Sequence, residues 1–131
     1  MNHVADQKAN RHLTYVLYLF YIISVFTGNL LAVIALVLNH VKRKAVRNSL
    51  LESHFSWQIR TFWWGCLWNI LTVGILALAL FNRELGFQLS DDHASLLFFT
   101  GLACVFTVGA WTVYRNLHGL FCLYGNKPMY D

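Results

Sequence analysis

The sequence predicts an all-helical membrane protein, a small bundle of three or four transmembrane helices with a basic amphipathic helix at the membrane surface. Hydrophobic residues make up 57% of the 131 residues and charged residues 12%, whereas soluble domains average about 45–50% and about 25%. Three stretches contain no Lys, Arg, Asp or Glu: 12–41, 61–82 and 93–114. A soluble domain of this size cannot bury three such stretches. The composition also excludes intrinsic disorder, which needs low hydrophobicity, and three cysteines among long apolar runs exclude a disulfide scaffold.

The first element is an apolar segment, 13–41, that follows a polar N-terminal tail, 1–12. It is longer than the apolar region of a secretory signal, about 7–15 residues, so we expect it to be retained. One transmembrane helix needs about 20 residues. The segment is therefore long for one helix and short for two, and breakers occupy its centre at 27–29. Two alternatives follow: one long tilted helix, or a hairpin of short helices at roughly 12–26 and 29–43.

The second element, 42–56, has the periodicity of a basic amphipathic helix at headgroup level. Its polar face repeats at steps of three and four residues and continues to Arg60. Its basic residues are expected to contact anionic lipid headgroups: Lys42, Arg43, Lys44 and Arg47. This helix is expected to continue without a break into the next one.

The third and fourth elements are transmembrane helices at 57–81 and 95–124. The first of these opens with the aromatic residues typical of a membrane interface: Trp57, Trp63, Trp64 and Trp68. A polar loop, 82–94, separates the two helices, and Ser90 with the acids after it is a plausible N-cap region. Gly125 and Pro128 are expected to end the last helix before a short tail, 125–131.

Charge sets the expected orientation, because loops rich in Lys and Arg stay in the cytoplasm. The segment 42–60 carries five such residues, and the C-terminal tail region adds Arg115 and Lys127. The acidic loop 82–94 is expected on the opposite side. Lys8 and Arg11 place the N-terminus in the cytoplasm only if the first apolar segment crosses an even number of times, which favours the hairpin.

Polar residues in or beside the predicted spans form two candidate groups. The first is an interfacial polar patch: Glu52, His54, Gln58 and Arg60. The second consists of intramembrane polar and small residues, expected to hold helices together or, in the alternative, to line a conduit: Asn69, Thr72, Thr100, Gly101, Cys104 and Thr107.

The sequence offers no catalytic constellation, and we expect no enzyme activity, cofactor, metal or nucleic-acid partner. No acidic residue occurs inside a span, whereas proton-coupled transporters usually need one. No HxxxH or CxxC spacing is present. A haem held between His54 and His118 near the cytoplasmic face is the one cofactor alternative.

The block from Glu52 to Arg60, ESHFSWQIR, resembles a bacterial family of uncharacterised integral membrane proteins grouped with the chloroplast import component Tic-twenty. The resemblance extends over most of the chain from about residue 13 and includes further segments: 39–43, 26–28, 111–115 and 126–129. Asn29 stands where the resemblance leads us to expect a second glycine. The resemblance implies a small helical bundle in a proteobacterial inner membrane and, by fold analogy alone, a distant link to protein translocation.

Three functions follow as hypotheses. The first is a non-enzymatic subunit that works by assembly, as a homo-oligomer or as an accessory part of a larger complex in the bacterial inner membrane. The second is a transporter or channel subunit. The third is a haem or redox protein.

Overall fold

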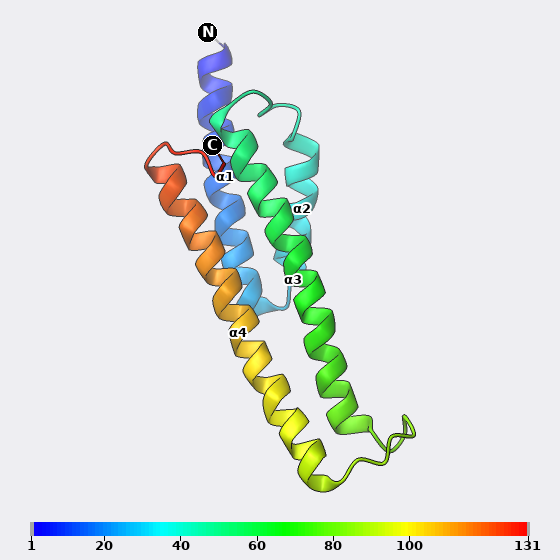
Figure 1. Cartoon of the computed structure of the whole chain (residues 1–131). Coiled ribbons are helices and arrows are strands. Elements are labelled where there is room, and N and C mark those ends of the chain that lie inside the picture. Colours follow the sequence, from blue (N-terminus) through cyan, green and yellow to red (C-terminus); the bar gives the residue numbers. More distant parts are fainter. Residues whose placement is uncertain (1, 131) are drawn as a thin grey trace. The chain divides into compact units, whose positions relative to one another are not determined.

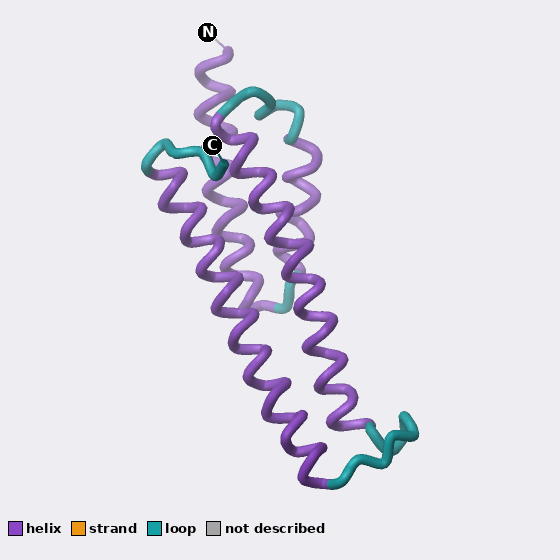
Figure 2. Tube along the Cα trace, viewed as in Figure 1, coloured by secondary structure: helices purple, strands orange, loops and turns teal. Residues whose placement is uncertain are grey.

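The structure, a computed structural model, describes residues 2–130, with side chains from His3, and this part of the chain forms four helices and no strand (Figures 1 and 2). The helices are α1 (Asn2–Thr27), α2 (Leu30–Lys42), α3 (Leu50–Phe81) and α4 (Asp91–Tyr124). The predicted all-helical class is confirmed. By length and composition, α3 and α4 are able to cross a membrane, whereas α2 is a shorter apolar helix.

The chain divides into two compact units. Unit 1 contains the chain up to Trp63 and from Thr112 onward, and unit 2 contains Trp64–Trp111. Unit 1 therefore holds α1, α2, the first turns of α3 and the last turns of α4. Unit 2 holds the remaining turns of α3 and α4 and the loop that joins them.

The first apolar segment forms two helices rather than one, and they lie antiparallel and side by side in unit 1 (Figure 1). The turn between them has positive φ angles at Gly28 (86°) and Asn29 (68°). Asn tolerates this left-handed conformation better than most residues do, so Asn29 serves where a second glycine was expected. The amides of both turn residues donate to the Ser24 carbonyl at 3.1 Å, which satisfies one of the carbonyls left open at the end of α1.

The predicted polar N-terminal tail, 1–12, is helical in its described part, because α1 begins at Asn2. Extending an existing helix adds one hydrogen bond per residue ordered. The sequence of these turns includes good helix formers, among them Ala5, Gln7 and Lys8. Arg11 also ties this part of α1 to the end of α4, since its guanidinium donates to the Leu123 carbonyl at 3.0 Å.

The prediction of an amphipathic helix over 42–56 is wrong in its first half, because residues 43–49 form turns and α3 begins at Leu50. Asn48 has a positive φ of 61°, which interrupts a helix at that point. Its backbone N–H donates to the Glu52 carboxylate at 2.8 Å, so this side chain helps to start α3. From Leu50 onward the helix continues without a break to Phe81, as expected.

The apolar core of unit 1 is built from α1, α2, α3, the end of α4 and the 43–49 turns: Leu17, Tyr18, Tyr21, Ala32, Ala35, Val46, Leu51, Phe55 and Leu123. Tyr18 is its largest fully buried side chain. Gly119 in α4 lies directly against the Tyr18 ring, and a Cβ at position 119 would overlap the ring and its hydroxyl. The absence of a side chain at position 119 is thus a packing requirement.

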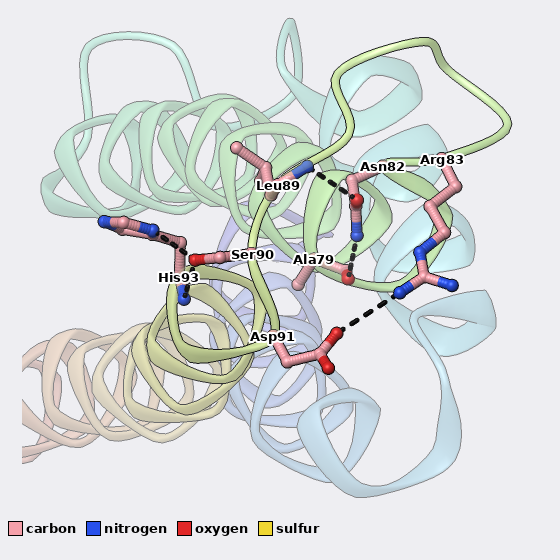
Figure 3. Close-up of polar contacts among 7 residues, drawn as sticks. All are labelled: Ala79, Asn82, Arg83, Leu89, Ser90, Asp91 and His93. Carbon is pink, nitrogen blue, oxygen red and sulfur yellow. Dashed lines mark hydrogen bonds and ion pairs between the residues drawn. The ribbon is translucent and has the colours of Figure 1, made fainter.

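In unit 2, α3 and α4 are joined by the loop 82–90, and α4 begins at Asp91, earlier than the expected residue 95 (Figure 3). Asn82 closes the loop: its side-chain oxygen accepts from the Leu89 amide, and its side-chain amide donates to the Ala79 carbonyl, both at 3.1 Å. Ser90 acts at the expected N-cap position, since its hydroxyl accepts from the His93 amide at 3.4 Å.

Candidate functional site

His54 lies at the centre of a buried polar cluster in unit 1. Its Nε2 is 2.9 Å from the Lys127 carbonyl oxygen, and its Nδ1 is 2.8 Å from the Tyr18 hydroxyl. Because a carbonyl only accepts hydrogen bonds, Nε2 carries the proton and donates, and Nδ1 accepts from Tyr18. Both ring nitrogens are in use, and burial lowers the pKa of His54, which favours this neutral form of the imidazole.

The C-terminal tail, residues 125–130, contacts α3 through His54, Ser53 and Arg60. The Met129 amide donates to the Ser53 hydroxyl at 3.1 Å. The Arg60 guanidinium lies 5.4 Å from the centre of the Tyr130 ring, a distance at which a cation–π attraction acts. The ESHFSWQIR block therefore presents the surface on which the tail lies.

Trp57 and Arg115 form a second pair in unit 1. The Arg115 guanidinium lies 3.7 Å from the centre of the Trp57 ring, and its Nε donates to the Thr61 hydroxyl at 3.0 Å. The Trp57 indole N–H donates to the Arg115 backbone carbonyl at 3.1 Å. A stacked arginine with directed hydrogen bonds holds α3 against α4 in a geometry that lysine cannot reproduce.

Three fully buried amide side chains have an oxygen without a hydrogen-bond partner among the described residues: Asn39, Gln58 and Asn116. Their nitrogens all donate, Asn39 to the Tyr21 hydroxyl at 2.9 Å and Gln58 to the Thr14 carbonyl at 3.4 Å. Asn116 donates to a carbonyl one turn earlier in α4. Buried polar atoms in folded proteins are almost always paired, so these oxygens are places where a donor such as water would be stabilised.

The structure does not bring the predicted interfacial patch together as one group. His54 and Gln58, one helical turn apart, are buried, whereas Glu52 turns back to the Asn48 amide and Arg60 is exposed beside Tyr130. The four predicted headgroup-contacting residues are all exposed: Lys42, Arg43, Lys44 and Arg47.

Unit 2 contains a groove of about 510 Å³ between α3 and α4. Of the predicted intramembrane residues, four line it: Thr72, Thr100, Cys104 and Thr107. Each of the three threonine hydroxyls donates to the backbone carbonyl four residues earlier. The groove surface is accordingly apolar in chemistry, although threonines form part of it.

The other two predicted intramembrane residues lie elsewhere in unit 2. Asn69 is exposed, does not line the groove, and donates to the Gly65 carbonyl at 2.7 Å. Gly101 is buried, and a Cβ there would overlap Leu76 of α3. Gly101 therefore brings α4 close to α3 inside unit 2.

The histidine and cysteine positions do not favour metal or haem ligation. Over residues 2–130, no three or more His, Cys, Asp or Glu side chains are grouped so that they could hold a metal ion. His54 has both ring nitrogens in hydrogen bonds, and His118 stacks on Tyr114 with its Nε2 3.8 Å from the Cys122 sulfur. A haem between the two histidines would first have to break one of the two His54 contacts, because one ring nitrogen must bind the iron.

Sequence reasoning missed three partners of this site: Tyr18, Gly119 and the tail residue Tyr130. Tyr18 lies inside an apolar run and was indistinguishable from a lipid-facing tyrosine. Gly119 is a lone glycine in a helical pattern, and such a residue is often a point of close packing, so it was the available signal.

Comparison of the chain with known protein families, curated proteins and solved structures gives no match.

Proposed function

We propose that this protein is a non-enzymatic, multi-pass protein of the bacterial inner membrane that works by assembly with a second copy of itself through the groove of unit 2. The observation that carries the proposal is the apolar surface of unit 2. Its exposed large side chains occur on both helices: Trp64, Leu67, Trp68, Ile70, Leu71, Val73, Leu80, Phe81, Leu96, Phe99, Val105 and Phe106. Monomeric soluble proteins rarely expose contiguous apolar patches larger than a few hundred Å², and lipid or another helix would cover this surface.

The first helical hairpin is part of the same proposal. The 13 residues of α2 span about 20 Å at 1.5 Å per residue, which is less than the roughly 30 Å of a bilayer core. We therefore take α1 and α2 as a re-entrant hairpin with both ends on the cytoplasmic side. The amides of Gly28 and Asn29 are hydrogen-bonded within the turn, as backbone inside a membrane requires.

The groove suits a packed helix better than a conduit. Its Thr72, Thr100 and Thr107 hydroxyls are already bonded to their own helices, so they offer little to a polar solute. Thr100 and Cys104, like Ala103 and Thr107, are small residues spaced four apart, which lets another helix approach closely. This favours assembly over the transporter alternative.

A second copy is the occupant that the surface itself suggests. Phe99 and Phe106 lie seven residues apart on α4 and are 67% and 77% exposed. At about 100° per residue they form a ridge adjacent to the small residues of the groove. A ridge and a groove side by side are what a two-fold interface needs, since each copy then places its ridge in the groove of the other.

The test uses cysteine cross-linking in native membranes. Cys104 lines the groove, so a variant that keeps only Cys104 should form a dimer with a short bismaleimide, whereas one that keeps only Cys66, outside the groove, should not. Filling the groove with Ala103→Trp should abolish the dimer. The matched control is Val105→Trp, an exposed position on the same helix about 200° away, which should retain it.

Two results would contradict the proposal. If the wild-type protein stays monomeric in membranes, the assembly function is wrong. If the cross-linked product contains a different protein, the partner is not a second copy and the chain has an accessory role. Orientation is tested separately: a cysteine at position 3 should be labelled only from the cytoplasmic side.

A further inference from the structure

A cleft of about 800 Å³ lies in unit 1 between the first turns of α1 and the connection from α2 to α3. Among the described residues, His3 and three Lys or Arg side chains line it, the latter being Arg11, Lys42 and Arg47. Asp6 is the one acid among the described residues of the lining. The cleft therefore has a clear excess of positive charge.

The connection 43–49 divides its basic residues between two environments. Arg47 lines the cleft together with Lys42 at the end of α2, whereas Arg43 and Lys44, in the same connection, do not line it. The turns at 43–49 produce this division, because in a continuous helix Arg47 would lie on the same face as Arg43 and Lys44, four and three residues before it. A general basic surface would make no distinction between the two pairs.

Arg11 is held in place before any ligand binds. Its guanidinium donates to the Asn126 side-chain oxygen and to the Leu123 carbonyl. Both acceptors are neutral, so they orient the guanidinium without cancelling its charge. Charge-assisted hydrogen bonds from such a group are among the strongest that a phosphate can receive.

A second part of the cleft lining is apolar, beside the polar side chains of His3, Gln7, Asn10, Asn48 and Ser49. Val46 and Leu51 are buried beneath it, and Ala9, Ala45 and Leu50 complete this side. A cleft with basic groups and an apolar lining matches a molecule that joins an anionic group to a hydrocarbon part. A free phosphate ion would use only the basic groups.

We infer that this cleft binds the phosphodiester headgroup of an anionic phospholipid, with the phosphate at Arg11, Lys42 and Arg47 and the glycerol and first acyl carbons on the apolar lining. The inference rests on the membrane location proposed above. It differs from diffuse attraction to the membrane surface, in which every Lys and Arg contributes alike.

The experiment measures lipid binding to the full-length protein in detergent by native mass spectrometry. The probes are phosphatidylglycerol, phosphatidylcholine and inorganic phosphate. The test variant is Lys42→Gln with Arg47→Gln, and the matched control is Arg43→Gln with Lys44→Gln, which removes the same charge from the same region outside the cleft. At about fivefold per cation, the test pair should weaken phosphatidylglycerol binding by about 25-fold, and the control by less than about threefold.

A third variant keeps the inference testable if the double substitution unfolds the protein. Asp6→Asn removes the only carboxylate of the cleft lining at an exposed position and should tighten phosphatidylglycerol binding by several-fold. Equal losses in the two glutamine pairs, equal binding of phosphatidylcholine, or displacement of the lipid by inorganic phosphate would each overturn the inference. These readouts do not involve dimer formation, so a failure here is distinct from a failure of the assembly proposal.

Discussion

Replacement of Gly119 by alanine tests how tightly the core of unit 1 is specified. A Cβ at position 119 would overlap both the ring and the hydroxyl of Tyr18. Tyr18 is fully buried and meets the His54 ring edge-on, with 5.9 Å between ring centres. A shift of the buried ring away from position 119 would disturb its contact with His54, and we expect the hydrogen bond between Tyr18 and His54 to break.

The size of the effect follows from three terms. Glycine to alanine inside a helix stabilises by about 1 kcal/mol. Overpacking a core typically costs about 1–3 kcal/mol, and leaving the buried Nδ1 of His54 without its donor costs a further 1–3 kcal/mol or so. Gly119→Ala should thus lower the free energy of unfolding by about 1–5 kcal/mol. Gly74→Ala is the matched control, because a Cβ there meets nothing within 4 Å; it should raise that free energy by up to about 1 kcal/mol.

The assay is reversible unfolding in mixed detergent micelles, followed by circular dichroism, for both variants and for a Tyr18→Ala background. Once the ring is removed, Gly119→Ala should no longer destabilise, since the overlap has gone. If Gly119→Ala is as stable as Gly74→Ala in the wild-type background, the proposed close packing of α4 on Tyr18 is wrong.

Four further substitutions test separate features of the fold, each through the free energy of unfolding in the same micelles. Arg115→Lys should lower this free energy by about 1–2 kcal/mol, because lysine keeps the charge but loses both the stack on the indole and the Nε hydrogen bond. An unchanged value would show that the contact does not stabilise the fold. Asn82→Ala should cost about 1–2 kcal/mol through its two lost hydrogen bonds, whereas Arg83→Ala should cost under about 0.5 kcal/mol, because its ion pair with the 93%-exposed Asp91 is solvated. Equal effects of those two would contradict the closure of the loop by Asn82. Gly28→Ala, at φ 86°, should cost about 1–2 kcal/mol from left-handed strain alone, and no cost would mean that the turn relaxes.

Much of the secondary structure was predictable from local chemistry. The helical periodicity and the breakers at Gly28 and Asn29 are local signals, and so is the N-cap at Ser90. The break at 43–49 was missed although it is local, because the amphipathic pattern runs through it. Asn48 has a positive φ, and its backbone amide donates to the Glu52 carboxylate. These two local features outweigh the amphipathic pattern.

The candidate site was predictable only in part, because its contacts join residues far apart in sequence. His54 was recognised as polar at a membrane boundary, yet its partners are 36 residues before it and 73 after it. No periodicity connects such positions. Grouping Glu52 with His54 was also wrong in physical terms, because side chains two residues apart on a helix point about 200° away from each other. Glu52 therefore helps to start α3, whereas His54 enters the core.

The tail and the proposed headgroup cleft are connected through a single side chain, and this connection can be tested. Asn126, at a positive φ of 54°, follows the end of α4, and its side-chain oxygen receives the Arg11 guanidinium. Asn126→Ala removes this acceptor but leaves every charge of the cleft in place. If an oriented Arg11 contributes to phosphate binding, this variant should weaken phosphatidylglycerol binding by several-fold in the same mass-spectrometric measurement. Asn126→Asp keeps the acceptor and adds a charge that competes for the guanidinium, so it should weaken binding at least as much. Wild-type affinity in both variants would show that the cleft acts through net charge, without the geometry that the tail imposes on Arg11.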